Sequence, residues 1–149
     1  MTQNGKTHKG KITREGIDMA TPTVVTAAPA VDGALPYNDA VPGAVTGVWA
    51  EESEKALVVA PDKLLPLLQH LRDREGYDFL SSVTCVDYSA YKGKLRAGSP
   101  ARFDVVYHIY STGKGGGPVR LHVPVPGDDT LPSATGVYPG ANLQEREVY

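Results

Sequence analysis

Two stretches in the second half of the chain alternate between apolar and polar residues, the pattern of strands that bury one face. Residues 102–111 place four apolar side chains opposite four polar ones: Phe103, Val105, Tyr107 and Ile109 against Arg102, Asp104, His108 and Tyr110. Residues 119–125 repeat the alternation at Val119, Leu121, Val123 and Val125. The loop TGKGGGP separates the two stretches, so the pattern predicts a β-hairpin.

Three more strands are predicted earlier in the chain. Val45–Trp49 and Ala56–Ala60 consist of β-branched, aromatic and small residues and flank the polar sequence Glu51–Glu54, which indicates a second hairpin. Residues 79–88, with the sequence FLSSVTCVDY, indicate a buried strand that ends at Asp87 and Tyr88.

An amphipathic helix is predicted between these strands. Four leucines recur at helical spacing and form a stripe that we expect in the core: Leu64, Leu67, Leu68 and Leu71. The helix should begin near Asp62, because Pro66 is tolerated only close to the first turn. Gly76 is suited to the C′ position that closes the helix.

The C-terminal stretch Thr130–Tyr149 predicts turns followed by a helix. Proline and glycine break its first half: Pro132, Gly136, Pro139 and Gly140. Asn142 is suited to the N-cap, and Glu145 lies three residues later, where its carboxylate can return to the N-cap N–H. The sequence stops at Tyr149 without a C-cap signal, and we expect this end to be a truncation.

Before the first predicted strand the sequence has no apolar period. Residues 1–32 are expected to be a flexible tail, which leaves residues 33–149 as a single domain. Residues 33–43 contain Pro36 and Pro42 and predict at most a weak helix.

Composition excludes several classes of function. A formal net charge of −2 gives no basis for nucleic acid binding, which usually needs a strongly basic face. The single cysteine, Cys85, excludes an internal disulfide, cannot by itself hold an iron–sulfur cluster or a structural zinc ion, and fits a reducing, cytoplasmic setting. No apolar run reaches about 18 residues, so neither a membrane span nor a signal peptide is expected. We therefore expect the isolated chain to carry no flavin, cluster or stoichiometric metal.

The glycine-rich loop between the last two strands is not a phosphate-binding loop. A P-loop ends in Gly-Lys-Ser/Thr and opens a helix, whereas TGKGGGP links two predicted strands. Lys114 in this loop is therefore not expected to bind a nucleotide.

His108 and His122 could form part of a metal site. If Ser111 pairs with Val119 across the hairpin, the two histidines lie opposite each other on one face of the sheet. A catalytic zinc ion normally takes three protein ligands. The third would have to come from Cys85 or another residue, so we interpret the histidines as half-buried structural residues.

Asp87 is the other residue that could complete such a metal site, although the sequence leaves its position open.

Pro124 and Pro126 remove backbone donors from the last strand, which predicts an edge strand or one that ends early. An apolar edge of this kind is a natural surface for a partner.

Glu145 and Glu147 are not expected to form an acid–base pair. Side chains two residues apart on a helix point about 200° from each other and cannot converge on one substrate. Glu145 is expected to support the helix N-terminus, while Arg146 and Glu147 reach other surfaces. This face is either solvated or covered by a partner.

Several segments, in this order, resemble the C subunit of the proton-pumping NADH:quinone oxidoreductase, respiratory complex I, the 30 kDa subunit family. They are Leu71-Arg72-Asp73, Val86-Asp87-Tyr88, RFDVVYHIYS, VRLHVPVP and LPSATGVYPGANLQEREVY, and the likeness covers residues 45–149. The sequence PGANLQERE is its most specific part. Leu143 stands where the family usually has tryptophan, which weakens one packing contact.

The resemblance implies an α+β fold, a two-layer sandwich of a mixed, largely antiparallel sheet with helices on one face. It implies a non-redox subunit in the peripheral arm at the cytoplasmic face of the membrane, bound to the D subunit and to cluster-carrying subunits. NADH, FMN, iron–sulfur clusters and quinone would lie in those partners. The family signature and expected partner interface comprise Asn142, Glu145, Arg146, Glu147 and Tyr149.

Two alternatives remain at this stage. One is the equivalent small subunit of a membrane-bound hydrogenase or of another quinone- or ferredoxin-linked dehydrogenase, which shares the motif and differs in its partners. The other is a free-standing zinc hydrolase built on His108 and His122.

Overall fold

The computed structural model describes residues 35–51, 54–90, 101–113, 117–127 and 129–148. The expectations for residues 1–32, for Lys114 and for Tyr149 lie outside these ranges. No helix within the described ranges is long and apolar enough to cross a membrane.

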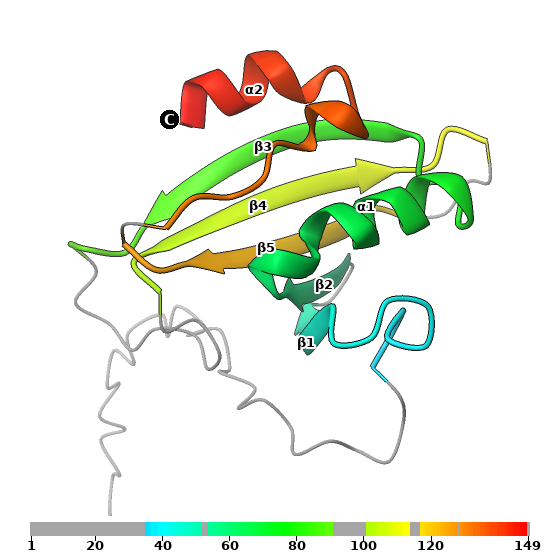
Figure 1. Ribbon diagram of the computed structural model, residues 1–149, viewed down its shortest axis with the longest axis horizontal. Coiled ribbons are helices and arrows are strands. Elements are labelled where there is room, and N and C mark those ends of the chain that lie inside the picture. The colour runs from blue at the N-terminus through cyan, green and yellow to red at the C-terminus, as the bar shows by residue number, and fades with distance from the viewer. Residues whose placement is uncertain (1–34, 52–53, 91–100, 114–116, 128, 149) are drawn as a thin grey trace, which may run out of the picture.

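Five strands form one mixed sheet (Figure 1). They are β1 (Val45–Glu51), β2 (Glu54–Val59), β3 (Phe79–Asp87), β4 (Phe103–Tyr110) and β5 (Val119–Val125). Their order in space is β1-β2-β5-β4-β3, and only β2 and β5 are parallel. The two predicted hairpins, β1–β2 and β4–β5, are confirmed.

The helices pack on one face of this sheet. They are the 3₁₀ turn η1 (Pro61–Lys63), α1 (Leu64–Asp73), the 3₁₀ turn η2 (Ala134–Gly136) and α2 (Ala141–Val148). In Figure 1, α1 lies across the middle of the sheet and α2 lies along β3. The predicted two-layer α+β sandwich is confirmed.

The core lies between these two layers. All four leucines of the predicted stripe are fully buried, and they share one cluster with Val105, Tyr107 and Ile109 of β4 and with the four apolar residues of β5. The segment before α2 joins the same cluster through Ala134, Val137 and Tyr138. Burying this much apolar surface is the main force that holds α1 and α2 on the sheet.

The ends of α1 differ slightly from the prediction. The chain enters through η1, and the helix ends at Asp73, with Arg74 as its C-cap. Gly76 follows two residues later and takes the left-handed φ of +75°, and the N–H of Tyr77 donates to the carbonyl of Leu71. Gly76 therefore does turn the chain at the end of α1, in a left-handed conformation that glycine adopts without strain.

The predicted sheet positions of two strands are wrong. β3 was expected to be buried, but it lies at the edge of the sheet in the strand order. Only two of its side chains, Leu80 and Val83, are buried. β5 is not the predicted edge strand, because it lies between β2 and β4, but its pairing with β2 does end early, the other predicted alternative. Its ladder with β2 ends at His122, before Pro124, so the proline does not have to donate to that ladder.

The weak helix considered for residues 33–43 is also wrong where the structure describes it. Residues 35–43 form turns, in which Tyr37 has a φ of +65°. The Asn38 side chain closes them by donating to the carbonyl of Val45 and accepting from its N–H, both at 2.8 Å. A side chain that bonds the backbone locally in this way competes with helix formation.

Candidate functional site

The C-terminal segment of the family signature is held from inside by Glu145. This residue is only 9% exposed, and it lies on the inner side of α2, one helical turn after the buried Ala141. One carboxylate oxygen accepts from the Ser133 hydroxyl at 2.6 Å, and the other accepts from the N–H of Ala134 at 2.7 Å. Glu145 therefore ties α2 to the start of η2.

This arrangement corrects the capping expected from the sequence. α2 begins at Ala141, so Asn142 lies inside the helix instead of at its N-cap. Glu145 places its charge at the N-terminus of η2, where free N–H groups favour an anion, and makes no use of its own helix end. The short helix η2 has Ser133 as its N-cap, whose hydroxyl also accepts from the N–H of Thr135.

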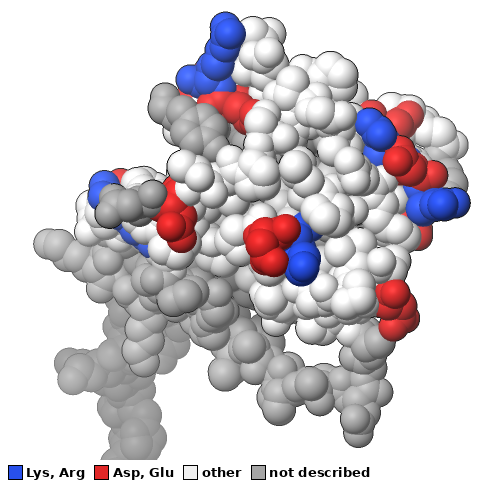
Figure 2. Space-filling view, viewed as in Figure 1, with Lys and Arg blue, Asp and Glu red and all other residues white. Residues whose placement is uncertain are grey.

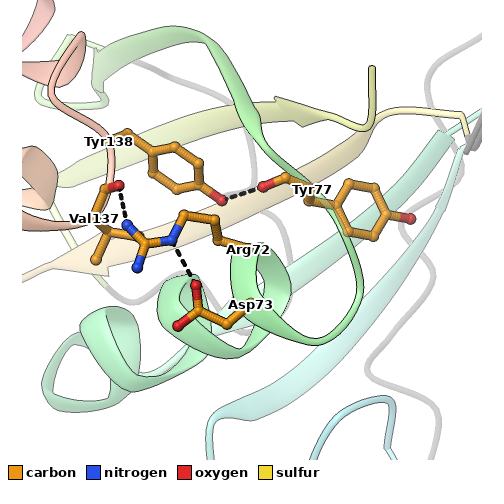
Figure 3. A network of polar contacts seen from close by, with 5 residues as sticks. All are labelled: Arg72, Asp73, Tyr77, Val137 and Tyr138. Atoms are coloured by element: carbon orange, nitrogen blue, oxygen red, sulfur yellow. Dashed lines mark hydrogen bonds and ion pairs between the residues drawn. The ribbon is translucent and has the colours of Figure 1, made fainter. Parts of the chain in front are cut away.

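A second network holds the same segment against α1 (Figure 3). Arg72 donates to the carbonyl of Val137 at 2.6 Å and to Asp73 at 2.7 Å, and the Tyr138 hydroxyl donates to the carbonyl of Tyr77 at 2.7 Å. The bond from Arg72 lowers the pKa of Asp73, and burial raises the pKa of Tyr138 to about 12. Tyr138 thus stays neutral and donating at physiological pH.

Sequence reasoning found no role for this network. Leu71-Arg72-Asp73 contributed only to the resemblance, because no local pattern connects Arg72 with Val137, which is 65 residues away. The Leu71 side chain is in the core, and the next residue, Arg72, reaches the carbonyl of Val137 in the segment before α2.

The outer side of α2 presents the remaining signature residues to solvent. Asn142, Arg146 and Glu147 are exposed, and Leu143 is 72% exposed, the largest fraction among the large apolar residues that the structure describes. Among the described residues, Arg146 has neither a hydrogen bond nor an ion pair. Figure 2 shows positive and negative groups together over α2, at the upper left. We call Asn142, Leu143, Arg146 and Glu147 the α2 outer surface.

An open hollow borders this surface. It has a volume of about 660 Å³ and is lined by Ser133, Thr135, Asn142, Glu145 and Arg146. The structure therefore brings three of the predicted signature residues together, at one side of α2. All five lining residues carry a polar or charged group, which suits a polar side chain of a protein partner.

The two histidines do not face each other as the metal-site hypothesis required. The β4–β5 register pairs Ile109 with Val119, so His108 lies opposite Arg120 and His122 opposite Val106. The expected register is thus wrong by two residues. Tyr110, which that register placed against β5, lies opposite Phe79 of β3.

Each histidine is engaged by a different residue. Arg120 donates to His108 Nε2 at 2.8 Å, and Ser82 lies 3.0 Å from its Nδ1, whereas His122 Nδ1 lies 2.7 Å from a carboxylate oxygen of the buried Asp104. Within the described ranges, no group of three or more His, Cys, Asp and Glu side chains is arranged to hold a metal ion.

Cys85 and Asp87, the two candidates for a third ligand, lie on the other face of the sheet. Cys85 is opposite Val105, whose side chain belongs to the core. Asp87 forms an ion pair with Arg102 at 3.1 Å and accepts from the N–H of Ser89. The bond from Arg102 is the main cause that lowers the pKa of Asp87 to about 2.

Proteins of similar sequence are C subunits of NADH-quinone oxidoreductases. The chain is 36% identical over 95 residues to the C subunit of the NADH-quinone oxidoreductase of Moorella thermoacetica, which covers 63% of this chain and 57% of the relative. It is 36% identical over 120 residues to the corresponding subunit of Azorhizobium caulinodans, covering 79% and 53%. The chain spans about half the length of the curated relatives that it matches.

Solved structures share the fold. The trypsin-resistant fragment of Nqo5 superposes with a TM-score of 0.61 at 28% identity, covering 68% of this chain and 78% of that one. A chain of the archaeal membrane-bound sulfane sulfur reductase superposes with a TM-score of 0.59, covering 75% and 64%, but at 20% identity this likeness shows the fold alone. The family model of the respiratory-chain NADH dehydrogenase 30 kDa subunit matches residues 57–149, more than half of the sequence, and the chain therefore belongs to this family.

Proposed function

We propose that this chain is a structural subunit, without a redox centre of its own, of an NADH:quinone oxidoreductase. In this proposal it lies in the peripheral arm at the cytoplasmic face of the membrane and binds the D subunit and the cluster-carrying subunits near the quinone end. It supports electron transfer from NADH to quinone, coupled to proton translocation, by holding these subunits together. Membership of the 30 kDa subunit family and the names of the similar proteins support the proposal.

The observation that carries the interface role is the guanidinium of Arg146, which has no partner among the described residues and lies on a helix that Glu145 holds in place. Arg146 lies in the last turn of α2, where the negative end of the helix dipole favours a cation but supplies no specific partner for the guanidinium. A guanidinium is suited to a carboxylate, which we place on the partner. Leu143 beside it offers an apolar side chain that solvent does not favour.

The internal anchors of α2 make this surface fit for binding. Glu145 fixes α2 to η2, Arg72 fixes the preceding segment to α1, and Tyr138 fixes it to Tyr77 in the turn after α1. A surface that is already ordered loses less conformational entropy when a partner binds. The α2 outer surface is therefore preorganised, and the hollow beside Arg146 gives room for a partner side chain.

Replacing Arg146 with alanine tests the proposal. If its carboxylate partner lies on the D subunit in a desolvated contact, Arg146→Ala should weaken assembly by roughly 2–5 kcal/mol. The free energy of unfolding of the isolated chain should stay nearly unchanged, since the Arg146 side chain is exposed. Co-purification with the D subunit and denaturant unfolding of the isolated chain measure the two quantities.

Arg74→Ala provides the matched control. Arg74 is another exposed arginine, at the end of α1, and its loss should change neither quantity. A loss of stability in the isolated Arg146→Ala chain, without an effect on assembly, would show that the partner of Arg146 is internal. No change in either quantity would refute the interface role.

The cofactor content and the kind of complex need separate measurements. Flavin or cluster absorbance, or an EPR signal, that follows the purified chain would contradict the proposal that redox centres lie in partner subunits.

Mass spectrometry that identifies the co-purified proteins distinguishes an NADH:quinone oxidoreductase from a related hydrogenase. Metal analysis tests the zinc hydrolase, whose two histidines have separate hydrogen-bond partners.

A further inference from the structure

β3 is a long edge strand that lacks the usual protection of an edge. It pairs with β4 on one side, and within the described part of the chain no strand pairs with its other side. Natural edge strands are commonly short or carry lysine or proline, which blocks the addition of a further strand. The nine residues of β3 include no proline, and no charged residue precedes Asp87 at its end.

The hydrogen-bond pattern identifies the backbone groups that face outward. The N–H of Tyr88 donates to the carbonyl of Arg102 at 2.9 Å, one step beyond the Asp87–Phe103 pair and in the same register. In an antiparallel ladder, alternate residues bond to the neighbouring strand and the residues between them point away. Ser82, Thr84 and Val86 therefore bond to β4, whereas Val83, Cys85 and Asp87 direct their N–H and C=O groups outward.

α2 determines where the open part of this edge begins. The Gln144 side chain donates to the carbonyl of Ser81 at 3.2 Å, beside the irregularity between Leu80 and Ser82. The free edge consequently runs from Val83 to Asp87. It adjoins α2, and hence the α2 outer surface, so that one neighbour can cover both.

We propose that an extended segment of a partner subunit adds to β3 as a further strand and pairs with Val83, Cys85 and Asp87. The inference rests on the proposed function in one respect, that this chain works within a complex. Along β3, N–H and C=O groups that pair with no described strand recur at every second residue, which fits an extended backbone, whereas a helix has used its own backbone groups. The Val86 side chain, 39% exposed on the face away from α2, fits an apolar side chain of the added segment.

Cysteine labelling tests the inference, because Cys85 is the only cysteine of the chain and lies in the middle of the free edge. The full chain is labelled with N-ethylmaleimide, both free and in the complex isolated through an affinity tag on this chain. Mass spectrometry of this chain then reports on Cys85. We expect labelling in the complex to be slower by on the order of tenfold or more, as for a site that must open before it reacts.

A pair of variants separates strand addition from simple coverage of the thiol. Cys85→Ala keeps the outward N–H and should still assemble, whereas Cys85→Pro removes this donor and should lose the complex. Proline at this position breaks no bond to β4, because the N–H of Cys85 points away from β4. Thermal unfolding of both free variants shows whether they fold.

Residue-resolved hydrogen exchange keeps the test valid if Cys85→Pro does not fold. In the unmodified chain, the amides of Val83, Cys85 and Asp87 should exchange fast when the chain is free and on the order of tenfold or more slowly in the complex. The amides of Thr84 and Val86 should be protected in both states.

Four results would overturn the inference. They are equal labelling in the free chain and in the complex, assembly of a folded Cys85→Pro variant, dimerisation of the free chain that slows labelling, and faster labelling after deletion of residues 1–34. The third result would assign the edge to a second copy and the fourth to the chain itself. Failure of the proposed function gives a different result, because isolation through the affinity tag on the unmodified chain would then recover no NADH dehydrogenase subunits.

Discussion

Truncation of Glu145 is expected to release α2 from the body of the domain. In Glu145→Ala, the N–H of Ala134 loses its acceptor at 2.7 Å, and the Ser133 hydroxyl loses its acceptor at 2.6 Å. Ala134 is fully buried, so water cannot easily replace the lost oxygen. Ser133 retains its bond to Thr135 and therefore loses less.

The magnitude follows from these two losses. A buried N–H without an acceptor costs about 1–3 kcal/mol, and loss of the second bond, partly replaced by Thr135, adds roughly 1 kcal/mol. We expect Glu145→Ala to lower the free energy of unfolding by about 2–4 kcal/mol. Glu145→Gln keeps one oxygen for Ala134, and its amide can donate to the Ser133 hydroxyl, so the cost should fall to about 1 kcal/mol.

Denaturant unfolding of the full chain measures these differences. The midpoint should shift for Glu145→Ala, with little change in its denaturant dependence, because the amount of surface exposed on unfolding stays similar. Glu147→Ala is the control, since Glu147 lies two residues away on the exposed side of α2 and should change stability by less than about 0.5 kcal/mol. Equal values for Glu145→Ala and Glu147→Ala would refute the role of Glu145 as an internal anchor.

Three further predictions follow from burial, from an ion pair and from the sequence. Leu68→Ala should cost about 2–5 kcal/mol in denaturant melts because Leu68 is fully buried, whereas Leu143→Ala, at an exposed site, should be nearly neutral, and similar values would contradict the packing. Asp87 has a pKa of about 2, below the ordinary 3.8, so its contribution to stability is present above about pH 4 and is lost as the pH falls toward 2. Denaturant melts across this pH range should show the loss of stability, and Arg102→Ala should reduce that loss. Deletion of residues 1–32 should leave the thermal midpoint nearly unchanged, since they lack periodic apolar positions, and a drop of many degrees would show that they dock.

Local patterns determined most of the secondary structure. The leucine stripe predicted α1, and the alternation in residues 102–111 and 119–125 predicted β4 and β5 together with their buried faces. These elements depend on which side chains avoid water, and that information is carried by neighbours along the sequence. The signature sequence also led to the family that the comparisons establish.

Register, strand order and long-range hydrogen bonds were decided only in the tertiary structure. A shift of two residues keeps every side chain of β4 and β5 on its face, so the alternation could not distinguish the pairing of His108 with Arg120 from a pairing with His122. The position of β5 beside β2 depends on α1, which carries the chain from β2 across to β3. Glu145 satisfied a local capping rule, yet packing turned it inward to Ser133 and Ala134, because a buried N–H at η2 gains more from the carboxylate than an exposed helix end does.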